Sequence, residues 1–390
     1  MRGVGRLTNS QLLPVDIVIQ PAQLSSATRE LAGSRVIALD TESNSFHFYP
    51  EQLCLIQIAT RHKICIIDTI ALPDVASLRG LLADASVMKV IHSADYDIRS
   101  LDRHSGLRIH NIFDTSIAAR FTGATRLGLE AVVRDVLGIT IGKSKQLQRS
   151  DWGRRPLSAE ALEYAATDVR HLIALQEILD QKLRTLGREL WAAEECAKLE
   201  EIRYTAPNIE TAYLSVKGAK ALDGRELAIL RSLFFFREEE ARRQHRPPFF
   251  VLPDATLSFL ATNPLTDLSD VPGLGQTGLK RFGKGLQQAL QNGLASPPVY
   301  RQKLPIKTIR TSEEQVQRLS RLKEWRTSLG LSLSLDPSLL WPMASLERLA
   351  RAPDTLGVEI THDSIRHWQR DVVAPYLKSW LESLRQYRRG

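Results

Sequence analysis

The chain has 390 residues, enough for two or three domains, and its hydrophobic content of 43% and charged content of 25% are ordinary for a globular protein. No apolar run approaches the roughly 20 residues that span a bilayer. The N-terminus also lacks an apolar segment followed by a small-residue cleavage site, so we expect a cytoplasmic protein that makes no membrane contact.

The three cysteines, Cys54, Cys65 and Cys196, are scattered and lack the spacing of metal ligands, which predicts reduced thiols. The net charge of +8 is unevenly distributed. Residues 1–205 hold 25 Lys and Arg against 25 Asp and Glu, whereas residues 206–390 hold 27 against 19. A modest basic excess often serves solubility alone, but its confinement to the second half suggests that this half meets polyanions.

Hydrophobic patterning predicts an α/β domain that ends near residue 200, with strands gathered first and helices following. Pro21 suits the first turn of a helix. Two apolar runs joined by a short polar link predict an antiparallel hairpin. The expected strands are 36–39, 53–59, 63–68 and 88–92, and the expected helices include one from residue 21 and one over 74–83.

Two carboxylates, Asp40 and Glu42, follow the first of these strands at the point where it would leave the core. Residues i and i+2 of a strand point to the same side, so both carboxylates can aim at one point. Two like charges that close are unfavourable unless a cation lies between them. Taken alone, however, the pair predicts a solvated turn or a helix cap more strongly than a metal site.

Two later stretches supply further acidic residues. Asp97 follows the strand 88–92 and lies in the first turns of the next helix, where an acid also suits the helix dipole. Tyr164 and Asp168 are spaced i, i+4 and therefore share one helix face. The alternative for this second pair is an amphipathic helix with a surface acid.

Together the three stretches closely resemble the three exonuclease motifs of the DEDD superfamily, in its tyrosine-bearing branch. Two further segments are similar to those of the ribonuclease D family: Lys145-Gln-Leu-Gln148-Arg-Ser150-Asp-Trp152-Gly-Arg-Arg155-Pro156-Leu157 and Asp114-Thr115…Ala118-Ala119-Arg120…Leu127-Gly128-Leu129. The resemblance covers residues 15–200. It implies a ribonuclease H-like, mixed-sheet α/β domain with 3′-5′ exonuclease activity, for which we expect the bounds 1–205.

This resemblance implies two divalent metal ions, Mg²⁺ or Mn²⁺, since two ions roughly 3.5–4 Å apart can clamp both reacting oxygens of a phosphodiester. Asp40, Glu42 and Asp168 would bind the metal on the nucleophile side, with Asp40 bridging both ions. Asp97 would hold the second ion, mainly through water. Tyr164 would orient the attacking water, because its reference pKa of about 10 makes it a less natural general base.

The resemblance also implies RNA as the substrate, and basic residues before the third motif are candidates to line its path. Lys145, Arg149, Arg154 and Arg155 would contact phosphates, although half of them would suit a solvated surface equally well. Phe46 is the candidate that stacks on the terminal base, because the position after the Asp-Thr-Glu motif holds serine here and phenylalanine in some members of the family.

The chain after residue 205 is patterned for helices only, with a first group over 211–293. This group resembles the helicase-and-RNase-D C-terminal (HRDC) domain, including its Pro-Pro, Pro-Asp and Pro-Gly turns. The turn at Gly273 and Gly275 can present backbone N–H groups to a phosphate, with Lys280, Arg281 and Lys284 close behind. A helix cap followed by a solvated basic face is the equal alternative.

A proline-rich, basic link over 296–305 precedes a second helical group over 311–386. This second group resembles a degenerate copy of the HRDC domain, without a clear counterpart of the Pro-Gly turn. We expect it to pack against the nuclease domain rather than to bind RNA.

The resemblance as a whole implies a monomeric 3′-5′ exoribonuclease that releases nucleoside 5′-monophosphates and trims structured RNA such as tRNA precursors. The residues leave two alternatives open, a DNA-directed 3′-5′ exonuclease and a catalytically silent RNA-binding scaffold. A complete acidic set argues against silence, because four unused carboxylates would repel one another. The preference for RNA over DNA rests on the family alone, since no residue identified from the sequence reads a 2′-hydroxyl.

Overall fold

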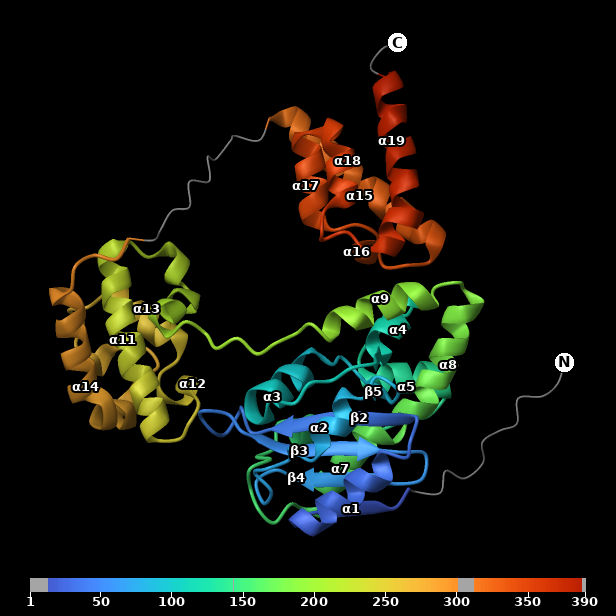
Figure 1. Ribbon diagram of the computed structural model, residues 1–390. Coiled ribbons are helices and arrows are strands. Elements are labelled where there is room, and N and C mark those ends of the chain that lie inside the picture. The colour runs from blue at the N-terminus through green and yellow to red at the C-terminus, as the bar shows by residue number, and fades with distance from the viewer. Residues whose placement is uncertain (1–12, 143, 301–311, 388–390) are drawn as a thin grey trace.

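A computed structural model describes residues 13–142, 144–300 and 312–387 of the chain. A sheet flanked by helices, here called the sheet domain, occupies the N-terminal half, and two separate groups of helices follow it (Figure 1). Residues 301–305 of the proline-rich link lie outside the described residues. None of the described helices has the length and the apolar character required to cross a membrane.

The strands of the sheet domain form one mixed sheet in the order β1-β4-β3-β2-β5-β6. They are β1 (Val15–Val18), β2 (Val36–Ser43), β3 (Leu53–Ala59), β4 (Ile64–Asp68), β5 (Met88–Ile91) and β6 (Ile112–Asp114). Strand β3 pairs antiparallel with both β2 and β4, which confirms the predicted hairpin, while the other pairings are parallel. The carboxyl ends of β2 and β5 therefore lie at the same edge of the sheet.

Helices cover both faces of this sheet. They are α1 (Pro21–Leu31), α2 (Leu78–Ala83), α3 (Asp95–Ser105), α4 (Thr115–Phe121), α5 (Leu129–Leu137), α6 (Lys145–Gln148), α7 (Ala159–Arg170), α8 (Leu172–Thr185) and α9 (Glu189–Leu199). Ile37 and Leu39 of β2 share a core with α1, α2 and α3, whereas Ala38 shares a core with α4, α5, α7 and α8. This split follows from the alternation of side chains along a strand, and it gives β2 two buried faces.

Two elements of the sheet domain differ from the sequence expectations. The patterning does not predict β6, because three residues are too few to show strand alternation. Helix α2 begins at Leu78 rather than near Asp74, whose carboxylate instead accepts the N–H of Ala76 in the preceding turn. All three cysteines are buried and free, and burial raises the pKa of Cys54 and Cys196 to about 12.

The first helical group is built around two long helices, α11 (Gly224–Arg243) and α14 (Gly275–Ala295). These helices approach closely because glycines of α14 face α11: a Cβ at Gly285 would collide with the ring of Phe236, and one at Gly293 would lie 2.6 Å from the Cα of Ile229. The other elements of the group are α10 (Ile209–Ala212), η1 (Tyr213–Ser215), η2 (Ala219–Ala221), α12 (Pro248–Val251), α13 (Asp254–Thr262) and η3 (Leu268–Asp270).

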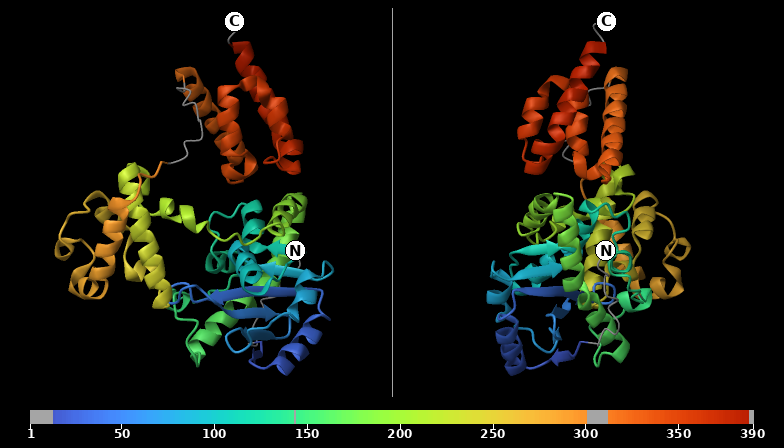
Figure 2. Two further views of the ribbon diagram at one scale, coloured as in Figure 1. Left: turned by 60° about the vertical axis from the view of Figure 1, so that its left-hand side comes forward. Right: turned by 90° about the vertical axis from the view of Figure 1, so that its right-hand side faces the viewer.

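This first group meets the sheet domain at the loop between β2 and β3, as both sets of views show (Figures 1 and 2). The ring of Phe48 stacks on that of His245 with centroids 5.2 Å apart. Tyr49 donates its hydroxyl hydrogen to Glu238 of α11 at 2.5 Å, and its backbone N–H donates to the carbonyl of His245 at 3.3 Å.

The second helical group packs directly on the sheet domain and shares a buried apolar cluster with it. Trp368 stacks on Trp191 of α9 with ring centroids 5.0 Å apart and meets Phe121 of α4 edge-on at 5.4 Å. Arg366 pairs with Glu195 of α9 at 3.0 Å. The group consists of α15 (Glu313–Leu333), α16 (Pro337–Leu340), α17 (Met343–Arg351), η4 (Pro353–Thr355), α18 (Leu356–Thr361), η5 (Gln369–Val373) and α19 (Ala374–Tyr387).

Candidate active site

Strand β2 and helix α7 bring three carboxylates together near the carboxyl end of β2. Asp40 and Glu42 occupy alternate positions of β2, on the side where Ala38 meets the core that contains α7. Asp168 lies on α7, in the helix predicted from the i, i+4 spacing. Ligand oxygens of the three side chains lie within 4.8 Å of one another.

The chemistry of this cluster suits a hard divalent cation. All three ligands are carboxylate oxygens, the donors that Mg²⁺ and Mn²⁺ prefer, and the cluster contains neither the thiolate nor the imidazole typical of zinc sites. Three negative charges this close repel one another unless a cation offsets them. The residues present therefore fit a metal ion at this point.

Tyr164 lies one turn before Asp168 on α7. Its side chain is only 7% exposed, and its ring centroid lies 6.0 Å from that of the buried Trp152. Burial, and then the charges of Asp168, Glu42 and Asp40, raise the pKa of the Tyr164 hydroxyl above its ordinary value. With its pKa raised, the hydroxyl stays protonated near neutral pH.

Asp97 approaches β2 from the opposite face of the sheet. It lies in the first turn of α3, and its carboxylate accepts a hydrogen bond of 2.5 Å from the hydroxyl of Thr41. Because side chains alternate along a strand, Thr41 points away from the Asp40 and Glu42 that flank it. Burial raises the pKa of Asp97 to about 7, while the hydrogen bond from Thr41 favours the ionised form. Asp97 therefore stands outside the cluster of three.

The position of α3, and thus of Asp97, is fixed by the buried carboxylate of Asp114. This carboxylate accepts the N–H groups of Ser93 at 3.1 Å and Ala94 at 2.8 Å, immediately before α3. It also caps α4 by accepting the N–H groups of Ser116 and Ile117. The sequence places Asp114 in a family-like segment, and the signal for its capping role is its position before a helix, since aspartate is a preferred N-cap residue.

The loop that follows Glu42 carries the exposed Phe46. The side chain of Asn44 holds the loop closed by accepting the backbone N–H of Gln52 at 2.8 Å. Phe46 is 50% exposed, and the guanidinium of Arg149 lies 5.9 Å from its ring centroid. Two residues expected to contact RNA, Phe46 and Arg149, therefore lie next to each other.

The other basic candidates of the sheet domain differ in whether their side chains already contact other residues of the protein. Arg154 is exposed. Arg155 makes a two-point ion pair with Asp68, with N–O distances of 2.5 and 2.6 Å, and also donates to backbone carbonyls. Its guanidinium thus holds its own segment against β4, a role that the sequence patterning does not indicate. The side chain of Lys145 lies outside the described part of the chain.

The glycine turn of the first helical group has the expected backbone. Gly273 and Gly275 adopt φ angles of 82° and 60°, and a Cβ at Gly273 would lie 2.6 Å from the hydroxyl oxygen of Thr256, so only glycine fits there. Helix α14 begins at Gly275. The basic side chains exposed in the following turns are those of Lys280, Arg281 and Lys284.

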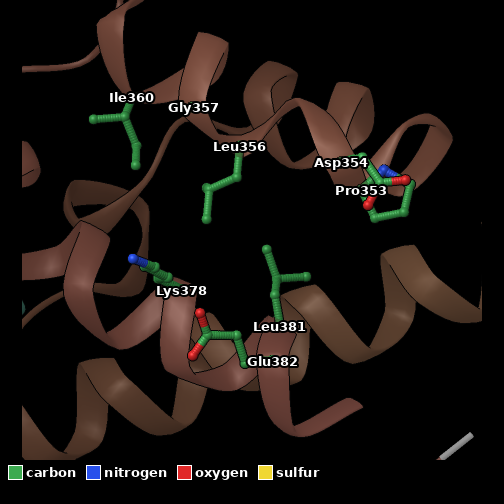
Figure 3. Close-up of a pocket in the computed structure, with 8 residues that line it drawn as sticks. All are labelled: Pro353, Asp354, Leu356, Gly357, Ile360, Lys378, Leu381 and Glu382. Carbon is green, nitrogen blue, oxygen red and sulfur yellow. The ribbon is translucent and has the colours of Figure 1, made fainter. Parts of the chain in front are cut away.

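A separate hollow of about 290 Å³ opens in the second helical group. Leu356, Ile360 and Leu381 form its apolar wall, and Lys378 and Glu382 flank Leu381 on α19 (Figure 3). All of its lining residues belong to that group, so the hollow is distinct from the carboxylate cluster.

Comparison with known proteins gives this site its class. A family model described as 3′-5′ exonuclease matches residues 15–184, and one described as HRDC domain matches residues 226–290. The fold and the acidic cluster thus define a 3′-5′ exonuclease that carries an HRDC domain.

Relatives narrow this class further. Ribonuclease D of Shewanella sp. (strain ANA-3) is 32% identical over 286 residues, covering 72% of this chain and 73% of that protein. Ribonuclease D of Pseudomonas paraeruginosa is 30% identical over 93% of this chain and 96% of that protein. The chain therefore belongs to the ribonuclease D family of 3′-5′ exoribonucleases.

Solved structures agree with this fold. The catalytic core of RRP6 from Trypanosoma brucei matches with a TM-score of 0.64 and 25% identity, over 74% of this chain and 81% of that one. Escherichia coli RNase D matches with a TM-score of 0.69 and 23% identity, over 96% of this chain and 99% of that one. The latter match extends the likeness of fold over the helical groups as well as the sheet domain.

Proposed function

We propose that this chain removes nucleoside 5′-monophosphates one at a time from the 3′ ends of structured RNA such as tRNA precursors. Its membership of the ribonuclease D family supports RNA as the substrate. The observation that carries the proposal is the cluster of Asp40, Glu42 and Asp168 within 4.8 Å, with Tyr164 one turn away on the same helix.

In this proposal the acidic residues hold two divalent ions, Mg²⁺ or Mn²⁺. Asp40, Glu42 and Asp168 would hold the first, and Asp40 together with Asp97 would hold the second, Asp97 mainly through water. Two such ions, when bound, activate the water that attacks the phosphodiester and stabilise the leaving oxygen. The place of Asp97 beside Thr41, outside the cluster of three, supports the indirect contact.

Tyr164 orients the attacking water in this proposal. Its raised pKa supports a role as a hydrogen-bond donor rather than as a general base, because the hydroxyl keeps its proton near neutral pH. The ring centroid of Trp152 lies 6.0 Å from that of Tyr164, so Trp152 packs against the Tyr164 ring and holds it in place.

The RNA path runs over Phe46, which stacks on the terminal base, and over Arg149 and Arg154, which contact phosphates. We assign residues 1–205 to the exonuclease domain, 211–293 to an HRDC domain that grips RNA through its basic α14 face, and 311–386 to a second, degenerate HRDC-like domain. The contacts of Trp368 with the sheet domain support a bracing role for that last domain. The protein acts as a monomer.

A time course on RNA and DNA oligomers of one sequence, labelled at either the 5′ or the 3′ end, tests the proposal. With Mg²⁺ or Mn²⁺, 3′-labelled RNA should release its label at once as a mononucleotide, while 5′-labelled RNA should shorten one nucleotide at a time. DNA should be degraded more slowly. Early release of a 5′ label, internal cuts or faster loss of DNA would contradict the proposal, and an inert wild-type protein would point to a binding scaffold.

A further inference from the structure

Two adjacent phenylalanines of the first helical group, Phe249 and Phe250, point into solvent on helix α12. They are 50% and 53% exposed, and their ring centroids lie 4.6 Å apart. Large apolar side chains scattered singly over a surface are common, but two exposed aromatic rings in contact form a patch. An exposed aromatic patch of this kind is typical of a ligand-binding or partner-binding surface.

The backbone holds these rings outward in a fixed position. Pro247 and Pro248 open the short helix, and the N–H of Phe250 donates to the carbonyl of Pro247 at 2.9 Å. The next two residues, Val251 and Leu252, are buried in the core of the group. Anchoring on both sides means that the rings lose little conformational freedom when a ligand stacks on them.

A cation completes the patch. The guanidinium of Arg246 lies 5.2 Å from the ring centroid of Phe250, and Arg246 is itself exposed. An arginine over an aromatic face beside an open ring offers a stacking surface for a base and a positive charge for the neighbouring phosphate. That combination suits single-stranded nucleic acid better than it suits an apolar peptide.

This patch follows directly in the chain on a residue that contacts the sheet domain. His245, next to Arg246 in the chain, stacks on Phe48 of the loop between β2 and β3 at 5.2 Å. The same loop carries Phe46, which has Arg149 5.9 Å from its own ring. Each of the two segments that meet here therefore carries an arginine–phenylalanine pair. The loop between β2 and β3 leads back to the carboxyl end of β2 (Figures 1 and 2).

We propose that Phe249, Phe250 and Arg246 form a stacking platform that binds bases of single-stranded RNA upstream of the 3′ end held at the carboxylate cluster. This inference rests on the proposed function, because it takes RNA as the substrate. The platform serves long substrates only, since an RNA that just fills the carboxylate site does not reach it. The exposed guanidinium of Arg246 beside these rings favours a polyanion over a protein partner as the occupant.

The test compares the full-length wild type with the double variant Phe249→Ala/Phe250→Ala on a dinucleotide and on a single-stranded RNA of about 15 nucleotides. Binding of the long RNA, measured by fluorescence anisotropy in chelator, should weaken on the order of tenfold to a hundredfold for each base that no longer stacks. With Mg²⁺, KM for the long RNA should rise while kcat and the cleavage of the dinucleotide stay unchanged. Tyr376→Ala, which removes an aromatic ring that is 52% exposed on the second helical group, is the matched control.

Two single variants separate stacking from apolar contact and guard against misfolding. Phe250→Trp keeps an aromatic face and should bind the long RNA as the wild type does, whereas Phe250→Leu keeps apolar area and should bind it weakly. Equal affinity of the double variant and the wild type for the long RNA would overturn the inference and leave a protein-binding surface instead. Failure of the proposed function would look different, because the wild type itself would then fail to degrade either RNA.

Discussion

Single side chains of β2 divide the acidic site between the two faces of the sheet. Asp40 and Glu42 lie on the face that meets α7, whereas Thr41 lies on the face that meets α3 and donates to Asp97 at 2.5 Å. One strand therefore positions carboxylates that arrive from two different helices. Thr41 is uncharged, but its hydroxyl helps to fix the position of the Asp97 carboxylate.

Replacing Thr41 by Val keeps the shape of the side chain and removes the donor to Asp97. Loss of a hydrogen bond to a charged group costs about 1.5–3 kcal/mol, so we expect roughly a tenfold or greater loss of kcat. As a positioning residue, Thr41 should also affect metal dependence: Thr41→Val should need more Mg²⁺ for half-maximal rate, and Thr41→Ser should not. A Mg²⁺ titration with the same midpoint for all three proteins would show that the hydrogen bond has no part in metal binding.

Replacing Tyr164 by Phe keeps the ring that packs on Trp152 and removes only the hydroxyl. We expect the single-turnover rate to fall on the order of a hundredfold, the lower end of the range for proton-transfer groups, because the hydroxyl only orients the water. Metal affinity and the free energy of unfolding should change little. Equal single-turnover rates for variant and wild type would mean that Tyr164 serves packing alone.

Whole elements carry the site through contacts distant in sequence. Asp114 joins the starts of α3 and α4 through four backbone N–H groups, and this fixes the helix on which Asp97 lies. Helices α4 and α9 in turn carry Phe121 and Trp191, on which Trp368 of the second helical group packs. The sheet domain and the second group thus share one core, and they should unfold together.

The variant Trp368→Ala tests this shared core. Removing a buried tryptophan costs about 3–5 kcal/mol, so the variant should be less stable, and unfolding of the second group should separate from that of the sheet domain. Denaturant unfolding followed by circular dichroism measures both effects. Trp380→Ala, at a partly buried tryptophan that packs on Trp325 inside the second group, is the control and should not separate the transitions. Separate unfolding of the sheet domain and the second group in the wild type would contradict a shared core.

At the scale of the whole molecule, two helical groups contact the sheet domain at different places and do different work. The first touches the loop after β2 and carries a basic α14 face, whereas the second covers α4 and α9. A chain that ended near residue 205 would keep all four acidic residues and Tyr164 but would uncover Phe121 and Trp191. Charge substitutions therefore test the RNA grip more cleanly than truncation does.

Neutralising the α14 face by Lys280→Ala, Arg281→Ala and Lys284→Ala should weaken binding of a tRNA precursor and flatten its dependence on salt. The slope of log affinity against log salt should fall by about 0.7–0.9 for each phosphate that the variant no longer neutralises, because fewer counterions are released on binding. The control is Arg321→Ala with Lys323→Ala, two exposed basic residues of α15. Unchanged slopes in the α14 variant would assign that face to another partner.

Much of the site follows from the sequence because strand and helix periods are local. The side-by-side placement of Asp40 with Glu42, and of Tyr164 with Asp168, needs only the periods of a strand and a helix. Other contacts join residues far apart in the chain, such as the ion pair of Arg155 with Asp68 and the stacking of Trp368 on Trp191. No local sequence pattern predicts such contacts. The sequence does not predict strand β6, because three residues are too few to show the alternation of buried and exposed side chains typical of a strand.

The single-turnover rate of 3′ nucleotide removal by Asp40→Asn tests the central claim most directly. Asn keeps the size of Asp40 but removes the charge that a divalent ion needs, so cleavage should fall to background with either Mg²⁺ or Mn²⁺. RNA affinity should remain broadly intact, because Lys and Arg contacts with phosphates supply most of it. Asp95→Asn, the same change at an exposed aspartate of α3 that pairs with Arg99, should cleave normally. A folded Asp40→Asn protein that degrades RNA at a rate near that of the wild type would contradict the assignment of the carboxylates to metal binding and catalysis.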